Sequence, residues 1–287
     1  MTAAVTVAIA QINTSFAGAD YLPLVAGYLR TYAEAHCAEP ARLRFREPLF
    51  RRIPVAPAVE HLLGADIVGF SLYVWNERLS LAIAKALKAA DPSVTIICGG
   101  PQVPDRSEAF LRANPFVDVA VNGEGEKVFA DILDRFPADD WSGIGGVSWI
   151  DGAGTFRTAP KPPRLRDLDV IPSPYLTGVF DDLMAAHGGR EWLMMWETNR
   201  GCPFSCTFCD WGSATQTKVN QFGDDRLLAE LDWVAAKRIG FMFCCDANFG
   251  ILKRDIDLAR RAAAVKAQSG FPQALSVQNT KNATERA

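Results

Sequence analysis

The sequence has no excess of positive charge, no long apolar run and no low-complexity tract. Its 287 residues include 30 lysines and arginines against 33 aspartates and glutamates, and the basic residues are scattered along the chain. A nucleic-acid partner is not expected, because binding to phosphates requires clustered basic side chains. The opening "MTAAVTVAIAQIN" has no basic leader and is too short to span a bilayer. We therefore expect a cytoplasmic protein without a membrane span.

Cysteine occurs in an odd number, seven, which argues against a framework of disulfides in a chain without an export signal. Cys37 and Cys98 stand alone in the sequence and are predicted to be packing residues. Hydrophobic residues make up 49% of the chain, enough for a large core, and the length indicates two domains.

Apolar runs alternate with helix-period segments between Val5 and Phe136, which is the pattern of a parallel sheet with crossover helices. About five strands are predicted, and they are apolar almost throughout, as expected where helices cover both faces of a sheet. The expected fold is a flavodoxin-like, Rossmann-like α/β domain. The run "GGVSWIDGAGTFRTAP" that follows predicts a β-hairpin, because two short apolar runs flank an Asp-Gly-Ala-Gly turn.

The second half begins after a proline-rich stretch. Five prolines between Pro160 and Pro174 indicate a semi-rigid linker. The βα pattern then resumes, with strands predicted at "EWLMMWETNRG", "FMFCCDANFG" and "ALSVQNT" and helices at "DDRLLAELDWVAAKRIG" and "DIDLARRAAAVKAQSG". The predicted organisation is a domain at 1–140, a hairpin and linker at 141–190, and the first half of a (β/α) barrel, a partial TIM barrel, at 191–287.

Three cysteines, Cys202, Cys206 and Cys209, lie within eight positions of the stretch "TNRGCPFSCTFCDWG", with no histidine among them. They follow a predicted strand and precede a predicted helix, so we expect them at the carboxyl end of a barrel strand, where such folds place their chemistry. Structural zinc needs four ligands. Three residues are candidates for the fourth: Cys244, Cys245 and His187.

An iron-sulfur cluster held by three thiolates keeps one iron open for a further ligand. The spacing favours such a cluster over zinc, with uncoordinated thiols as the third alternative. Cys244 and Cys245 are adjacent on a predicted strand and point to opposite faces, so we favour packing over ligation for them.

The segment Cys202-Pro-Phe-Ser-Cys206-Thr-Phe-Cys209 resembles the signature of the radical S-adenosylmethionine (radical SAM) enzymes. The resemblance implies that the three cysteines hold a [4Fe-4S] cluster whose fourth iron chelates SAM. It also implies reductive cleavage of SAM to a 5'-deoxyadenosyl radical, with an external electron donor such as flavodoxin or ferredoxin.

The same resemblance implies SAM contacts near the ends of the barrel strands. The implied residues are Phe208, beside the cluster or the adenine, together with Asp246, Asn248, Ser276, Gln278 and Asn279; Trp211 is a candidate wall of the pocket. From the residues alone, "CCDANFG" also fits a plain turn, "LSVQNT" a polar strand end, and the two aromatic residues a core.

The first half resembles the cobalamin-binding domain that precedes the radical SAM barrel in one subgroup. The segments that carry this resemblance are "YLPLVAGYLRTYAE", "ADIVGFSLYVWN", "IICGGPQVP", "FVDVAVNGEGEKVF" and "IPSPYL". The implied cobalamin contacts are Ser71, Tyr73, Trp75, Asn76, Gly99, Gly100, Pro101, Gly123, Glu124 and Gly125. They follow three strands, where an open α/β sheet forms its ligand crevice, and glycines allow the backbone to approach a flat cofactor. Singly, each glycine pair also fits a tight turn.

This sequence lacks the Asp-x-His-x-x-Gly motif whose histidine coordinates cobalt in many cobalamin domains. The run "HLLG" from His61 to Gly64 has Val59 where the aspartate belongs, so His61 is predicted to be a helix-end residue. Trp75 or Tyr73 is then expected to cover the lower face of the cobalt with an apolar surface.

Together the two resemblances imply a cobalamin-dependent radical SAM enzyme that uses a [4Fe-4S] cluster, SAM and cobalamin. Methyl transfer to an unactivated carbon of a small-molecule or peptide substrate is the expected activity. Cyclisation or rearrangement by the same architecture is an alternative. A non-catalytic corrinoid or metal-binding module is another, because about three βα units are predicted where such barrels generally have about six.

Overall fold

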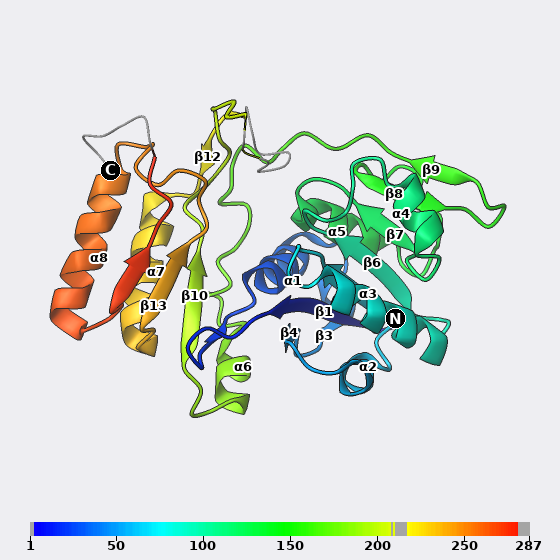
Figure 1. Cartoon of the computed structure of the whole chain (residues 1–287), viewed down its shortest axis with the longest axis horizontal. Coiled ribbons are helices and arrows are strands. Elements are labelled where there is room, and N and C mark those ends of the chain that lie inside the picture. The colour runs from blue at the N-terminus through cyan, green and yellow to red at the C-terminus, as the bar shows by residue number, and fades with distance from the viewer. Residues whose placement is uncertain (1–2, 208, 210–216, 281–287) are drawn as a thin grey trace. The chain divides into compact units, whose positions relative to one another are not determined.

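The computed structural model describes residues 3–207, 209 and 217–280, and the chain divides into two compact units (Figure 1). The first unit comprises Met1–Thr14 and Pro23–Arg164, and the second comprises Ser15–Leu22 and Leu165–Ala287. Within the described ranges, no helix has both the length and the apolar character needed to cross a membrane.

The first unit is built on a mainly parallel sheet. Its parallel strands are β1 (Val5–Asn13), β3 (Leu43–Phe45), β4 (Leu49–Arg51), β5 (Ile67–Ser71), β6 (Thr95–Gly99) and β7 (Val119–Val121). β3 and β4 both pair with β1 on its outer side, and the order then runs β1-β5-β6-β7. With β3 and β4 taken as one position this is the flavodoxin-like order, so the predicted fold is confirmed. The predicted hairpin is β8 (Val147–Ile150) and β9 (Phe156–Thr158), which extends the same sheet in antiparallel fashion.

Helices cover both faces of this sheet. They are α1 (Leu24–His36), α2 (Val55–Leu62), α3 (Glu77–Ala90), α4 (Glu108–Ala113) and α5 (Gly125–Arg135), with a short 3-10 turn η1 at Pro40–Arg42. Alternate β1 residues Ala8, Ala10 and Ile12 join a buried cluster with residues of α2 and α3. On the opposite face, a Cβ added to Gly69 of β5 would lie 3.3 Å from the ring of Phe129 in α5. Near-continuous burial of the strands follows from this double cover.

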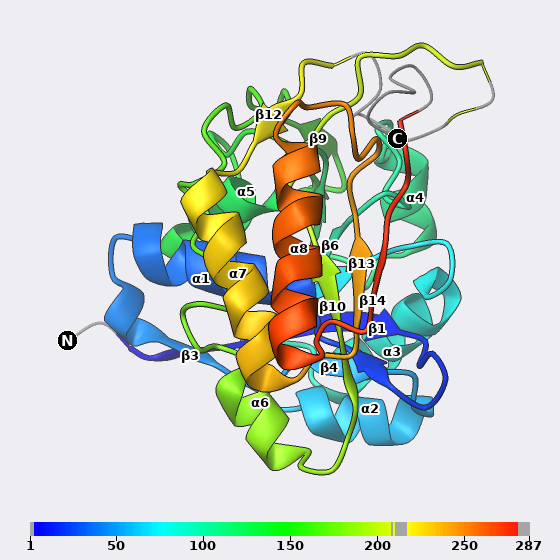
Figure 2. The same ribbon diagram turned by 90° about the vertical axis from the view of Figure 1, so that its left-hand side faces the viewer.

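The second unit contains a parallel sheet in the order β14-β13-β10-β2. Its strands are β10 (Trp192–Trp196), β13 (Phe241–Cys244), β14 (Ala274–Ser276) and β2 (Asp20–Tyr21). The main helices are α7 (Asp224–Lys237) and α8 (Asp255–Ser269), which lie side by side along the strands in Figure 2, and a short helix α6 spans Asp181–Ala186. The described strands form an open sheet, the first βα units of the predicted barrel.

Two features of the second unit differ from the sequence prediction. The edge strand β2 comes from residues far upstream: the Asp20 N–H donates to Glu191 O at 3.0 Å, and the buried Asp20 carboxylate pairs with Arg190 at 2.8 Å. The segment predicted as one strand from Glu191 to Gly201 instead splits. Its end, β11 (Asn199–Arg200), pairs antiparallel with β12 (Asn220–Gln221) in a separate ribbon.

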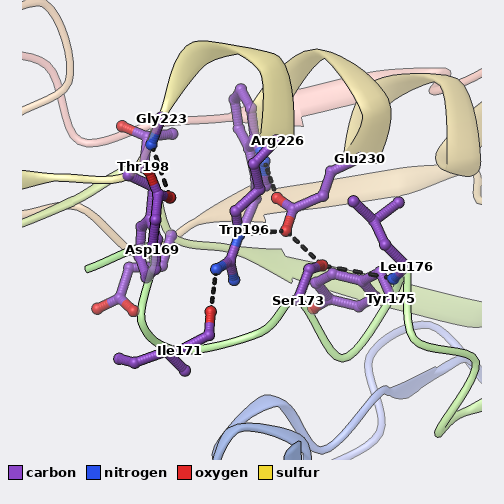
Figure 3. Close-up of polar contacts among 12 residues, drawn as sticks. Asp169, Ile171, Ser173, Tyr175, Leu176, Trp196, Thr198, Gly223, Arg226 and Glu230 are labelled. Carbon is purple, nitrogen blue, oxygen red and sulfur yellow. Dashed lines mark hydrogen bonds and ion pairs between the residues drawn. The ribbon is translucent and has the colours of Figure 1, made fainter. Parts of the chain in front are cut away.

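The proline-rich segment after Leu165 packs within the second unit through a buried carboxylate (Figure 3). Glu230 of α7 is 2% exposed and accepts hydrogen bonds from Ser173 Oγ at 2.6 Å and from Trp196 Nε1 at 2.9 Å. Arg226 pairs with Glu230 at 3.0 Å and donates to Ile171 O. Burial raises the pKa of Glu230, while Arg226 opposes that rise. The segment is therefore held to both β10 and α7.

Gly100, which follows β6, has a φ of +102° and lies against the backbone of Leu72. A Cβ added there would be 2.6 Å from Leu72 O, so both the dihedral angle and the space require glycine.

We predict that Gly100→Ala lowers the free energy of unfolding by about 2 kcal/mol or more. Gly152→Ala, in the hairpin turn with nothing within 4 Å of the added Cβ, should change it by less than about 0.5 kcal/mol. Urea unfolding measures both; equal stabilities of the two variants would contradict the prediction.

Candidate functional site

The three cysteines lie on a loop that follows β10 and is closed by a short antiparallel stem. The stem consists of β11 and β12, and the Thr217 N–H donates to Cys202 O at 2.9 Å. Cys202 is buried, whereas Cys206 and Cys209 are exposed. The loop is thus anchored at Cys202 and presents its other two thiols outward.

The loop is also tied to the next strand end. Asn248, which follows β13, donates from Nδ2 to the sulfur of Cys202 at 3.1 Å. A predicted SAM-contact residue and a predicted cluster ligand therefore meet, although 46 positions separate them in the sequence. This meeting follows from the parallel pairing of β10 with β13, which brings their carboxyl ends together.

The donor chemistry of the loop fits an iron-sulfur cluster. Between Cys202 and Cys209 the sequence offers three thiols and no carboxylate or imidazole, and soft thiolate ligands suit such clusters. Among the residues that the structure describes, no three histidine, cysteine, aspartate or glutamate side chains are grouped as metal ligands. The assignment of the three cysteines to a cluster therefore stays a prediction.

Of the remaining cysteines, Cys37, Cys98 and Cys244 are buried packing residues, and Cys245 is partly buried. Cys244 is fully buried and pairs in register with Trp196, whose indole points to Glu230 of α7, so Cys244 faces the helices as well. Burial raises the pKa of both the Cys244 and the Cys245 thiols, which disfavours thiolate. Cys37 and Cys98 are buried too, as predicted, and burial raises the pKa of Cys37 to about 12.

Asp246 is buried at the end of β13 and binds the end of β10. Its Oδ1 accepts from the N–H groups of Thr198 at 2.8 Å and Asn199 at 3.2 Å. Its Oδ2 accepts from the Thr198 hydroxyl and from Asn199 Nδ2, the latter at 2.8 Å. Burial raises the pKa of Asp246 to about 7, against the lowering effect of these hydrogen bonds.

The third strand end comes to the same edge of the sheet. Ser276 ends β14, and the O of the exposed Gln278 accepts a hydrogen bond from the Phe249 N–H at 2.8 Å. Asn279 forms an isolated parallel bridge with Phe249. The predicted residues Phe208 and Trp211 lie outside the residues that the structure describes. The roles of all these residues in SAM binding stay predictions.

In the first unit, the loop after β5 is organised by a buried asparagine. Asn76 is 1% exposed; its Nδ2 donates to Ile12 O at 3.0 Å and Ser71 O at 2.9 Å, and its Oδ1 accepts from the Tyr73 N–H at 2.8 Å. The rings of Tyr73 and Trp75 stack with centroids 4.6 Å apart, and Trp75 is 48% exposed. The loop therefore presents an aromatic surface on a backbone fixed by Asn76.

The glycine segments follow the next two strands. Gly99 ends β6, with Gly100 and Pro101 after it; Gly123 follows β7 with a φ of +95°. Glu124 precedes α5, which Gly125 begins, and pairs with Arg164 at 3.4 Å. All of the predicted cobalamin residues thus lie at the carboxyl edge of the sheet, where glycine backbone and an exposed aromatic side chain fit a flat macrocycle. Their individual contacts stay predictions.

Sequence reasoning missed Asn122, which connects two of these loops. It is buried at the end of β7, accepts from Ser107 Oγ at 3.1 Å and donates from Nδ2 to Pro104 O at 3.1 Å. Its position directly before Gly123 matches the strand-end position of a loop-organising residue, which is the signal that could have identified it. His61 lies in the last turn of α2, as predicted, with Nε2 2.9 Å from Glu47 O.

The second unit also has a pocket of about 640 Å³, which is lined by other residues than the predicted cluster and SAM residues. It is lined by Asp169, Pro172, Ser173, Leu176, Gln221, Gly223, Asp224, Asp225, Arg226 and Arg254. None of these residues belongs to the predicted cluster or SAM set. Figure 3 shows part of this wall, where Asp169 accepts from the Gly223 N–H at 2.9 Å.

The raised pKa of Asp246 predicts a pH dependence of stability. Its folded value is about 7 against an ordinary 3.8, so the folded state binds the proton more tightly than the unfolded state. This contribution to the free energy of unfolding is full below about pH 4 and is lost as the pH rises to about 7. Asp246→Asn should remove that component, whereas Asp257→Asn, at an exposed aspartate, should keep it. Urea unfolding at several pH values tests this; identical slopes in the two variants would refute it.

Comparisons with known proteins agree with both halves of this arrangement. Residues 20–133 match the family model described as "B12 binding domain". The chain is 42% identical over 270 residues to the cobalamin-dependent radical SAM methyltransferase TokK of Streptomyces tokunonensis. It is 41% identical to a 2-(S-pantetheinyl)-carbapenam-3-carboxylate methyltransferase of Streptantibioticus cattleyicolor. Each match covers 93% of this chain, which spans about 40% of each relative's length.

Solved structures share the fold. The cobalamin-dependent radical SAM enzyme OxsB, with aqua-cobalamin and SAM bound, matches 92% of this chain and 37% of its own with a TM-score of 0.68 at 17% identity. The radical SAM methyltransferase TsrM from Kitasatospora setae matches 93% of this chain and 52% of its own with a TM-score of 0.64. The chain thus contains a match to the B12-binding domain and is similar over most of its length to cobalamin-dependent radical SAM enzymes.

Proposed function

We propose that the protein carrying this chain is a cobalamin-dependent radical SAM methyltransferase that acts on an unactivated carbon. The observation that supports this best is the joint presence of a B12-binding unit and a Cys-x3-Cys-x2-Cys loop after the first strand of the second unit. Identity of 42% to a methyltransferase over 93% of the chain favours methyl transfer over other outcomes of the same architecture.

In this proposal the cysteine loop holds the cluster, and the neighbouring strand ends hold SAM. Cys202, Cys206 and Cys209 are the thiolate ligands, and Asn248, which already bonds to the sulfur of Cys202, orients that ligand. Ser276 and Gln278 lie on the strand end beyond and are proposed contacts of SAM. When bound, the cluster and SAM supply a carbon-centred radical, and cobalamin supplies the methyl group.

The first unit holds cobalamin at the carboxyl edge of its sheet. The glycine backbones after β6 and β7 would allow the macrocycle to approach closely, because they carry no Cβ. Trp75 lies half-exposed on the loop after β5, stacked on Tyr73, and provides an apolar face where other cobalamin domains place a histidine. Trp75 would offer bound cobalamin an apolar surface and no nitrogen ligand, and cobalamin would supply the methyl-transfer chemistry.

The proposed substrate is a small molecule. The name of one relative gives its substrate as 2-(S-pantetheinyl)-carbapenam-3-carboxylate, and this compound is the first substrate to test. The electron donor is proposed to be a flavodoxin or ferredoxin, since reductive cleavage of SAM needs an outside electron.

Ring formation is the second candidate function. An anaerobic magnesium-protoporphyrin IX monomethyl ester cyclase of Cereibacter sphaeroides is 29% identical over 144 residues, 48% of this chain. The lower identity and shorter match favour methyl transfer. The two reactions differ in their products, because a methyl transfer that regenerates the cofactor from SAM also yields S-adenosylhomocysteine.

The test is anaerobic incubation of the whole protein with SAM, hydroxocobalamin, a reductant and the carbapenam. We expect 5'-deoxyadenosine and S-adenosylhomocysteine in comparable amounts, together with a product heavier by one methylene unit, all measured by mass spectrometry. 5'-Deoxyadenosine without S-adenosylhomocysteine would refute the methyltransferase and favour the cyclase.

Cysteine variants control this experiment. Cys206→Ala should lose most of the roughly four irons expected per reconstituted chain and should form no 5'-deoxyadenosine. Cys245→Ala, at a partly buried thiol outside the cysteine loop, should retain both the iron and the nucleoside. One tightly held zinc in place of iron would overturn the proposal.

A separate prediction concerns the lower face of the cobalt. Trp75→His introduces an imidazole where the proposal places an apolar ring, so the visible absorption spectrum of the bound cobalamin should shift to that of a nitrogen-ligated form. Val74→His, at the more exposed neighbouring position, should leave the spectrum unchanged. An unchanged spectrum in the Trp75 variant would exclude Trp75 from the lower face.

A further inference from the structure

The N–H, the hydroxyl and the carbonyl oxygen of Thr198 all form hydrogen bonds. It lies at the carboxyl end of β10 and is fully buried. Its N–H donates to Asp246 Oδ1 at 2.8 Å and its hydroxyl donates to Asp246 Oδ2. Its carbonyl oxygen accepts from the Phe222 N–H at 3.0 Å and from Arg254 Nη2 at 2.8 Å. Side chains of two residues from the next βα unit, Asp246 and Arg254, thus hold Thr198 from both sides.

Both oxygens of the Asp246 carboxylate accept hydrogen bonds from the protein. A carboxylate offers about four lone-pair sites, and four hydrogen bonds from Thr198 and Asn199 reach its two oxygens. With 1% of the residue exposed, no side of the group faces solvent. The carboxylate therefore has neither a lone pair nor access left for a bound ligand.

Arg254 provides the matching contact from the start of α8. Its side chain is 12% exposed, and Nη1 pairs with Asp224 Oδ1 at 2.5 Å and donates to Phe222 O. Its Nη2 reaches Thr198. Arg254 therefore connects the first turn of α7, the end of β12 and the end of β10.

The cysteine loop begins directly after this held residue. Asn199 and Arg200 form one side of the stem, and Gly201, with a φ of +120°, leads into Cys202. A Cβ added to Gly201 would lie 2.5 Å from Lys218 O, so the two sides of the stem are in close contact. Asn199 of the stem bonds to Asp246 through both its N–H and its side-chain amide, and Asn220 donates to Leu165 O at 2.7 Å. The end of the stem is therefore joined to the residues that hold Thr198.

We propose that Asp246 and Arg254 are positioning residues that fix Thr198 and thereby place the cysteine loop, and that Asp246 makes no contact with SAM. The role in the loaded enzyme rests on the proposed function. The ordering of the loop by these two side chains is a property of the chain alone, and it is measurable without cofactor.

The first test is hydrogen exchange of the cofactor-free chain. In Asp246→Ala and in Arg254→Met, the Thr217 amide, which donates to Cys202 O, should exchange about tenfold faster or more, because each substitution removes a buried hydrogen-bond partner. The matched controls are Asp257→Ala and Arg260→Met, which break an exposed ion pair on α8 and should leave this amide unchanged.

Two smaller substitutions at Thr198 test the same proposal in case the Asp246 and Arg254 variants do not fold. Thr198→Val removes the hydroxyl bond to Asp246 and the bond that this hydroxyl accepts from Asn199 Nδ2, and it should speed exchange of Thr217 by about fivefold. Thr198→Ser keeps the hydroxyl and should restore the rate. Far-ultraviolet circular dichroism checks that each variant is folded. Wild-type exchange rates in Thr198→Val and in every folded Asp246 or Arg254 variant would overturn the proposal.

The second test separates positioning from SAM contact. After reconstitution with iron and sulfide, Asp246→Ala and Arg254→Met should both bind less iron than wild type, by about threefold or more, and the two controls should match wild type. If Asp246 instead bound SAM, its variant would keep full iron and normal exchange and would lose only SAM affinity, and Arg254→Met would behave as a control. Failure of the wild-type chain to take up iron would sink the proposed function while leaving the exchange result to decide the positioning role.

Discussion

Parallel strands must bring their carboxyl ends to one edge of a sheet, and this constraint places every candidate site in the chain. In the first unit the loops after β5, β6 and β7 carry the predicted cobalamin residues. In the second, the loops after β10, β13 and β14 carry the cysteines and the predicted SAM residues. The hydrogen bond between Asn248 and Cys202 is a direct consequence, since residues 46 positions apart meet only because their strands are paired.

Buried polar side chains at these edges serve the loops themselves. Asn76, Asn122 and Asp246 are nearly inaccessible, and each has protein partners for its polar atoms. A buried polar group without a partner is costly, so such residues are retained where they satisfy backbone groups that secondary structure leaves unpaired. Trp75 and the thiol of Cys206, by contrast, are exposed.

The buried ion pair of Glu230 and Arg226 shows the same principle away from the candidate sites. Burying a carboxylate is costly unless charge and hydrogen bonds compensate, and Glu230 has Arg226, Ser173 and Trp196 around it. Removing any one of these partners would leave the buried carboxylate of Glu230 less well compensated. The proline-rich segment after Leu165 is therefore part of the second unit's packing, although its composition is that of a linker.

The sequence by itself determined the alternating strands and helices of the first unit, the hairpin, the βα repeats of the second unit and the cysteine loop. These depend on local periodicity, turn chemistry and a short motif, which neighbouring residues encode. Only the tertiary structure decided that β2 pairs with β10, that Asn122 connects two loops, and that Asp246 holds Thr198. Each of these joins residues from distant segments through one or a few hydrogen bonds, and no local pattern specifies which buried donor will find which acceptor.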